Sequence, residues 1–209
     1  MRALRAVQIT DLSAVGEEML LARLDEAAAL PAHLRARLAV QLRDPQLPGR
    51  ALIRLGEVLR ARTRAIGAAL IVNDRLDVAV ALGADGVHLG RRSLPVAEAR
   101  RWLGAGAWVS RSAHGLDEVA AAAREGASAV LLSPVLASPG KGSPLGLAAL
   151  GAARRLLDAS PAPPLLVALG GIDASSARAA LDAGADAVAA IRAHLARAEV
   201  LDYQAPHGR

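Results

Sequence analysis

Two side chains of this sequence suit proton transfer and anion binding better than any others. His114 ends the run Arg111-Ser112-Ala113-His114, and Lys141 is the only lysine among 25 basic residues. A histidine can give and take a proton near neutral pH, because its ordinary pKa is about 6.5. A lysine ammonium can reach a phosphate as a compact point charge on a flexible stem. We therefore expect His114 and Lys141 to act in catalysis.

Further polar side chains stand at the ends of apolar runs. A buried polar group without a partner costs about 1–3 kcal/mol, so polar residues gathered at one end of buried strands indicate a binding site rather than a core. Thr10 and His88 also end such runs, and for these two we expect hydrogen bonds that anchor loops. The residues predicted to bind substrate are Gln41, Arg43, Asn73, Ser112 and Ser138.

A glycine pair offers backbone N–H groups to a phosphate. Gly170-Gly171 follows one apolar run, and Ala190-Ile191-Arg192 ends another. Free N–H groups at a helix N-terminus bind anions, and an arginine adds a charge-assisted hydrogen bond. We predict that these five residues bind a phosphate where a helix begins.

Eight short apolar segments are predicted as buried strands, and segments with helical spacing lie between them. Leu52, Leu55 and Leu59, for example, have the spacing of one helix face. Such alternation is typical of either an open doubly wound sheet or a closed barrel. The predicted strands are Ala6–Thr10, Ala39–Arg43, Ala68–Asn73, Gly86–Leu89, Trp108–Ser112, Ala129–Ser133, Leu165–Leu169 and Ala187–Ile191.

The barrel is the better interpretation of this pattern. Eight strands in 209 residues favour a single-domain α/β fold, the (β/α)₈ TIM barrel. A dinucleotide-binding sheet would need a Gly-x-Gly-x-x-Gly turn after its first strand, and the segment 10–13 holds no glycine. In a TIM barrel the active site lies at the carboxyl ends of the strands, where the polar residues above fall. We expect one domain over residues 1–209, with its motifs between about residues 5 and 195.

A repeat supports this organisation. Its glycine suits the left-handed position that ends a helix, and the apolar residues after it suit a buried strand. Each copy is therefore interpreted as the end of a helix and the start of a strand. The copies are Gly83–Val87, Gly126–Val130 and Gly184–Val188.

Composition limits the partners that we expect. The absence of cysteine excludes disulfides and thiolate chemistry. No apolar run reaches the roughly 18 residues of a membrane span, so we expect no membrane contact and a cytoplasmic location. The formal charge of +5 comes from scattered arginines with few aromatic residues between them, so we do not expect nucleic-acid binding. A small-molecule partner remains, and the sequence permits a homo-oligomer.

The order of the motifs resembles the family that contains thiamine phosphate synthase and the TenI-type thiazole tautomerase. The most specific match is Asn73-Asp74-Arg75 followed by Gly83–Gly90, which is similar to the family pattern N-D-R and G-A-D-G-V-H-L-G. The resemblance implies a TIM barrel that acts on a phosphorylated thiazole. Further matches are Val40–Arg43, Ser112–His114, Ser133–Val135, Gly170–Ile172 and Gly184–Asp186.

The resemblance implies a metal site if the chain is a synthase. Synthases of this family join an aminopyrimidine diphosphate to a thiazole phosphate, and Mg²⁺ on the diphosphate helps it to depart. Asp74 matches one metal-binding aspartate, but the position of the second holds Ser93, whose hydroxyl is a poor ligand for Mg²⁺. Lys141 keeps its family position, whereas Pro45 and Arg192 replace a lysine and a serine of the pattern.

The tautomerase branch needs neither a metal nor another cofactor. It isomerises a phosphorylated thiazole carboxylate by proton transfer, and its histidine lies in an R-S-x-H run like that of His114. The eroded metal ligands favour this reaction, with His114 as general acid–base and with Arg43 and Lys141 facing the carboxylate or the phosphate. Two alternatives remain open. One is a divergent synthase with Mg²⁺ at Asp74, and the other is a non-catalytic barrel that senses a phosphorylated metabolite or regulates a partner.

Overall fold

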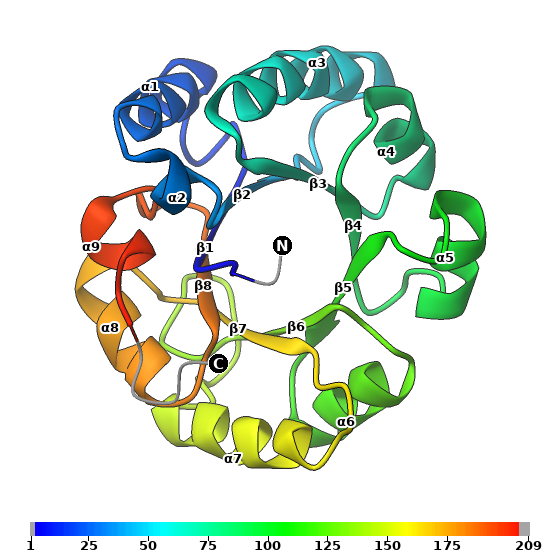
Figure 1. Cartoon of the computed structure of the whole chain (residues 1–209), viewed down its shortest axis with the longest axis vertical. Coiled ribbons are helices and arrows are strands. Elements are labelled where there is room, and N and C mark those ends of the chain that lie inside the picture. Colours follow the sequence, from blue (N-terminus) through cyan, green and yellow to red (C-terminus); the bar gives the residue numbers. More distant parts are fainter. Residues whose placement is uncertain (1–2, 205–209) are drawn as a thin grey trace.

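The eight predicted strands form a closed parallel barrel. The computed structural model describes residues 3–204, in which each strand pairs with the next and the last pairs with the first (Figure 1). Each predicted strand is confirmed to within one residue at either end. The strands are β1 (Ala6–Ile9), β2 (Leu38–Leu42), β3 (Ala69–Asn73), β4 (Gly86–Leu89), β5 (Trp108–Ala113), β6 (Ala129–Leu132), β7 (Leu165–Leu169) and β8 (Ala187–Ala190).

Helices surround the barrel and cover the outer faces of its strands (Figure 1). In the longest of them, Leu52, Leu55 and Leu59 are buried against the sheet, as the helical spacing predicts. None of the helices in residues 3–204 is long and apolar enough to span a bilayer. The helices are α1 (Glu17–Ala28), α2 (Ala32–Arg35), α3 (Gly49–Ile66), α4 (Leu76–Leu82), α5 (Val96–Leu103), α6 (Leu116–Arg124), α7 (Leu147–Asp158), α8 (Ala174–Asp182) and α9 (Ala198–Leu201).

The Gly-Ala-Asp repeat joins helix ends to strand starts, as predicted, and it also binds the strands together. The side chain of Asp85 accepts the backbone N–H of Leu70 at 2.8 Å, and that of Asp186 accepts the N–H of Leu166 at 2.8 Å. Both bonds lie where β3 and β7 begin. The repeat therefore stabilises the end of the barrel opposite the strand carboxyl ends.

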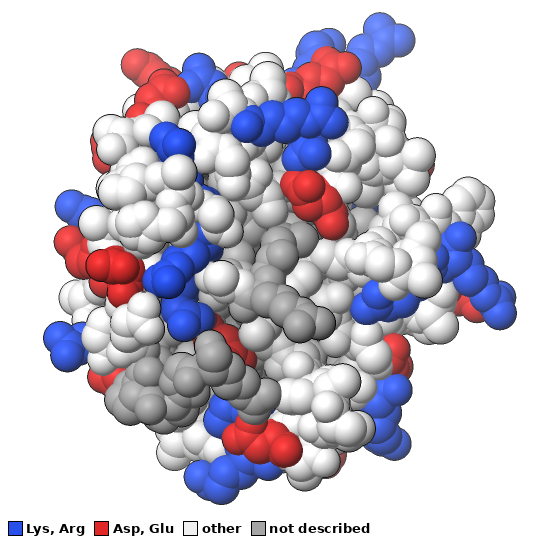
Figure 2. Space-filling view, in the orientation of Figure 1, with Lys and Arg blue, Asp and Glu red and all other residues white. Residues whose placement is uncertain are grey.

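Apolar side chains fill the barrel itself as well as the layer between strands and helices. The interior cluster includes Val7, Ile9, Ile71 and Val167, and Leu4 packs with it. On the face that Figure 2 shows, basic and acidic side chains are interspersed rather than gathered by sign. The barrel is thus a packed scaffold, and the site must be sought at its polar rim.

Candidate active site

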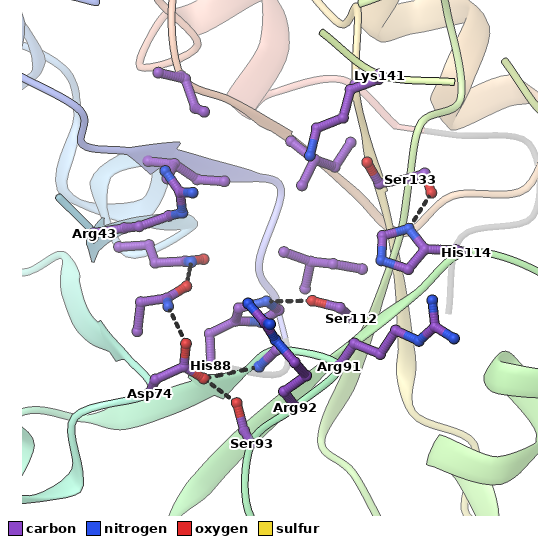
Figure 3. A pocket seen from close by; sticks show the side chains of 18 of the residues that line it. Arg43, Asp74, His88, Arg91, Arg92, Ser93, Ser112, His114, Ser133 and Lys141 are labelled. Carbon is purple, nitrogen blue, oxygen red and sulfur yellow. Dashed lines mark hydrogen bonds between the residues drawn. The ribbon is translucent and has the colours of Figure 1, made fainter. Parts of the chain in front are cut away.

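A pocket of about 800 Å³ lies at the carboxyl ends of the strands (Figure 3). The structure brings together residues from strands β1 to β7 and from the loops that follow β2 to β8. The predicted site residues that line this pocket are Gln41, Arg43, Asn73, Asp74, Ser93, Ser112, His114, Ser138, Lys141, Gly170 and Ile191. Gly171, Ala190 and Arg192 line a smaller adjoining pocket.

A chain of hydrogen bonds orients the carboxylate at the rim. Gln41 Nε2 donates to Asn73 Oδ1 at 2.9 Å, and Asn73 Nδ2 donates to Asp74 Oδ2 at 2.7 Å. The other oxygen of Asp74 accepts the N–H of Gly90 at 2.9 Å and the hydroxyl of Ser93. Asp74 has a φ of 59°, a left-handed conformation that is unusual outside glycine and that recurs at functional sites.

The pocket is rich in positive charge. Arg43 and Lys141 extend into it from different sides, and two neighbouring arginines of the β4–α5 loop, Arg91 and Arg92, lie near its rim (Figure 3). Asp74 is the one carboxylate among the described residues that line it. The balance of charge is therefore that of a site for a polyanion.

His114 presents one ring nitrogen to the pocket. Its Nδ1 lies 2.7 Å from the backbone carbonyl oxygen of Ser133, which can only accept a hydrogen bond. Nδ1 must therefore carry the proton, which leaves Nε2 of the neutral ring as an acceptor. The backbone N–H of His114 donates to Glu118 Oε2 at 2.8 Å, so the loop that bears the ring is held at both sides. The ring is placed for proton transfer or for binding an anion.

His88 is buried below the rim. Its Nδ1 lies 3.0 Å from Ser110 Oγ and its Nε2 lies 2.9 Å from Ser112 Oγ. Burial is the main cause that lowers the pKa of His88 to about 4; in that value the charge of Asp74 opposes the shift, and the charges of Arg43 and Arg111 add to it. The ring is therefore neutral at pH 7, and it orients Ser112.

The sequence-based expectation for Thr10 and His88 agrees with these contacts. Thr10 Oγ1 donates to the carbonyl oxygen of Arg43 and accepts the N–H of the same residue, both at 2.9 Å. This pair of bonds fixes the backbone from which the Arg43 side chain extends. Both residues anchor the rim.

Acid should destabilise the protein through His88. Between pH 6.5 and about 4 the unfolded chain binds a proton at this residue and the folded chain does not, so stability falls as the pH falls. This difference between the unfolded and folded pKa corresponds to roughly 3 kcal/mol. Urea unfolding should be measured for the wild type and His88→Asn at pH 7 and at pH 4. The free energy of unfolding of the wild type, relative to that of His88→Asn, should fall by this amount between the two pH values. A stability difference between the two proteins that is the same at both pH values would contradict the assignment.

Arg111 does not enter the pocket, although it lies at the end of β5 in the sequence. Its Nη1 donates to the carbonyl oxygen of Leu94 at 2.9 Å, and its Nε lies 3.8 Å from Glu125. Neighbouring residues of a strand point to opposite faces, and Ser112 is the one that faces the pocket. Arg111 therefore packs on the helix side of the sheet.

The smaller pocket, of about 210 Å³, shares Ser138, Leu169, Gly170 and Ile191 with the larger one. Within residues 3–204, the backbone N–H groups of Gly171 and Arg192 have no protein acceptor. This concave surface of free donors suits a phosphate group.

The predicted helix N-terminus at this place is wrong. No helix starts directly after β8, because the chain bends from residue 191 and α9 begins only at Ala198. The N-terminus of α8, after β7, is capped by its own Asp173, which accepts the N–H of Ser176 at 2.8 Å. The Arg192 side chain is exposed. Any phosphate here would be held by loop N–H groups rather than by a helix dipole.

Two side chains that the sequence analysis missed form hydrogen bonds to the carbonyl oxygens of the loop after β8. Gln8, buried in β1, donates from Nε2 to the carbonyl oxygens of Ala190 at 3.2 Å and Ile191 at 3.0 Å. Arg23 of α1 donates to the carbonyl oxygen of Arg192 at 2.9 Å. A lone polar residue in an apolar strand is the signal that could have identified Gln8. These bonds orient the N–H groups of the loop.

Comparison with known protein families identifies the family to which this chain belongs. A family model described as thiamine monophosphate synthase matches residues 7–194. The chain belongs to this family. The family recognised from the sequence motifs is thereby confirmed, and the relatives below, which are named as synthases, indicate an enzyme of the transferase class.

Relatives and solved structures agree with the family assignment. The chain is 46% identical over 164 residues to a thiamine-phosphate synthase of Methanoculleus marisnigri, covering 77% of this chain and 75% of the relative. It is 40% identical over 188 residues to one of Roseiflexus castenholzii, covering 88% and 78%. A thiamine phosphate pyrophosphorylase from Pyrococcus furiosus superposes with a TM-score of 0.74 at 29% identity, covering 96% and 92%. These names favour the synthase alternative over the tautomerase that the motifs suggested.

Proposed function

We propose that this member of the family is a thiamine phosphate synthase, which joins an aminopyrimidine diphosphate to a thiazole phosphate and releases pyrophosphate. The observation that carries the proposal is the pair of joined pockets. One is lined by Arg43, Arg91, Arg92 and Lys141, and the other by the loop donors of Gly171 and Arg192. A reaction between two phosphorylated substrates needs two anion sites that share one reaction space. The tautomerase substrate has one phosphate.

The chemistry assigns a role to each pocket. The phosphate group of the thiazole substrate binds in the smaller pocket, at Gly170-Gly171 and Ala190–Arg192. The diphosphate group of the aminopyrimidine substrate binds at the basic side chains of the larger pocket. The bond between the pyrimidine methylene carbon and the diphosphate oxygen breaks, with the electron pair leaving on the diphosphate. The thiazole nitrogen then bonds to that carbon. Lys141 and Arg43 stabilise the charge that grows on the leaving diphosphate.

The amide and hydroxyl side chains of the pocket orient the organic parts of the substrates. Gln41 and Asn73 are joined by a hydrogen bond, and the hydroxyl of Ser112 lies 2.9 Å from His88 Nε2 (Figure 3). Ser138 lines both pockets. We assign these four polar residues to substrate binding. They supply donors and acceptors that a pyrimidine ring and its amino group require.

The Mg²⁺ site that the resemblance implies does not fit these residues. Within residues 3–204 no group of three or more histidine, aspartate or glutamate side chains is placed to hold a metal ion. The carboxylate of Asp74 already accepts hydrogen bonds from Asn73, Gly90 and Ser93. The roles above therefore rest on the side chains of the chain alone.

The free Nε2 of His114 is the observation that keeps the tautomerase as a second candidate. Replacement of His114 by asparagine retains a donor near the Ser133 carbonyl but removes the proton exchange. We expect the formation of thiamine phosphate by His114→Asn to stay within about tenfold of the wild type, whereas an acid–base role would cost about 10²–10⁴-fold. Steady-state rates of both proteins decide this. A loss beyond a hundredfold would place His114 in the chemistry.

A direct test offers the purified protein both substrate sets. The proposal predicts thiamine phosphate from the aminopyrimidine diphosphate and the thiazole phosphate, and no isomerisation of the thiazole carboxylate phosphate. Isomerisation without condensation would establish the tautomerase instead. Tight binding of the thiazole phosphate with neither reaction would support the sensing or regulatory alternative.

A further inference from the structure

The loop after β4, in which the family pattern has its second aspartate, is basic in this chain. Arg91, Arg92 and Ser93 follow Gly90 directly after β4, and all three line the large pocket. Ser93 donates its hydroxyl to Asp74. The loop therefore turns toward the pocket, and it brings two guanidinium groups next to Ser93, which holds the position of the family carboxylate.

The lone carboxylate of the pocket is poorly placed to bind a cation. Three donors already point at Asp74, the Asn73 amide at 2.7 Å, the Gly90 N–H at 2.9 Å and the Ser93 hydroxyl. A divalent cation would have to displace at least one of them. It would also have to lie beside Arg91 and Arg92, whose positive charges would repel it.

The basic side chains of the pocket form no close ion pairs with carboxylates of the described residues. Arg43 lies 3.7 Å from Asp11 and Arg91 lies 3.8 Å from Glu118, both longer than a hydrogen bond. Among the described residues, Arg92 and Lys141 have no carboxylate within ion-pair distance. These side chains can turn to an anionic ligand without breaking a strong bond in the protein.

We propose that Arg91 and Arg92, with Arg43 and Lys141, bind the diphosphate directly, so that this pocket holds a diphosphate without a divalent cation. Guanidinium groups match phosphate oxygens with paired, charge-assisted hydrogen bonds, and they supply the positive charge that a metal would supply. The inference rests on the proposed function for the identity of the substrate. The binding of a diphosphate group can be measured without turnover.

Calorimetric titration with inorganic pyrophosphate tests the inference. The wild type should bind pyrophosphate in the presence of EDTA, and an excess of Mg²⁺ should change the affinity by less than about threefold. Arg91→Gln/Arg92→Gln should weaken binding in EDTA by about tenfold or more, because two charge-assisted contacts are lost. The matched control is Arg54→Gln/Arg101→Gln, which removes the same charge from exposed helix positions and should bind like the wild type.

Replacement of Asp74 by asparagine separates the arginine site from a metal site. If the arginines hold the anion, Asp74→Asn keeps or strengthens pyrophosphate binding in EDTA, because a like charge is removed. Binding that requires Mg²⁺ and is lost in Asp74→Asn would overturn the inference, and so would equal affinities of the two arginine double variants.

The outcome for the reaction is distinguishable from the outcome for the binding site. Pyrophosphate binding in EDTA without any formation of thiamine phosphate would support the arginine site and reject the synthase. Formation of thiamine phosphate only with Mg²⁺, together with no pyrophosphate binding in EDTA, would support the synthase and reject the arginine site.

Discussion

Replacement of Lys141 by methionine should lower the rate of thiamine phosphate formation by about 10²–10³-fold, mainly in kcat. The residue is exposed on the loop between β6 and α7, and its ammonium extends into the pocket (Figure 3). Its charge would act most strongly as the diphosphate departs, so the transition state should lose more than the bound substrate. Steady-state kinetics with both substrates measure this effect.

Lys141→Arg is the matched variant for this experiment. It keeps the positive charge but replaces a compact ammonium by a planar fork, so we expect a rate between those of the wild type and of Lys141→Met. The methionine variant should unfold at the same urea concentration as the wild type because the loop is exposed. Equal kcat values for the wild type and Lys141→Met would remove this lysine from the mechanism.

Replacement of Gly171 by alanine should destabilise the fold by about 2–5 kcal/mol. An added Cβ would lie 2.4 Å from the carbonyl oxygen of Ala137 and 2.8 Å from Leu136 Cβ, and the φ of 69° disfavours any side chain. The cause is close packing of the β7 loop against the loop after β6. Urea unfolding of the two proteins measures the loss.

Gly67→Ala is the control, because Gly67 has a similar φ of 75° but open space where the Cβ would be. It should cost only the conformational part, about 1–2 kcal/mol. A loss in Gly171→Ala no larger than that in Gly67→Ala would show that the close approach of Ala137 is unimportant.

The barrel could be predicted from the sequence because each of its layers has its own pattern. Short runs of valine, leucine and alanine predicted the strands, and the spacing of Leu52, Leu55 and Leu59 predicted a helix face. The closure of the sheet followed from the number of strands in the length available. Polar residues at the strand ends then placed most of the pocket correctly.

Contacts between distant segments could not be predicted in this way. Gln8 stabilises the loop after β8 across 182 or more positions of sequence, and no local pattern indicates its partner. Arg111 points away from the pocket because side chains alternate along β5, and a one-residue change of phase would have reversed its face. The helix expected after β8 is absent there because the chain bends before α9.

The sequence motifs also could not decide between the synthase and the tautomerase reactions. Ser93 in place of an aspartate favoured a reaction without metal, and this led to the tautomerase. The structure places Arg91 and Arg92 beside that serine, so the lost carboxylate coincides with two added charges in the same pocket. The sequence shows both arginines next to Ser93, whereas only the fold shows that they share one pocket with Arg43 and Lys141.

A crystal structure of the protein with thiamine phosphate and pyrophosphate tests the central claim most directly. The account predicts both products in the joined pockets at once, with the phosphate of thiamine phosphate at Gly171 and Arg192 and pyrophosphate at Arg43, Arg91, Arg92 and Lys141. Pyrophosphate bound elsewhere, or a single anion site that admits one product and excludes the other, would contradict it.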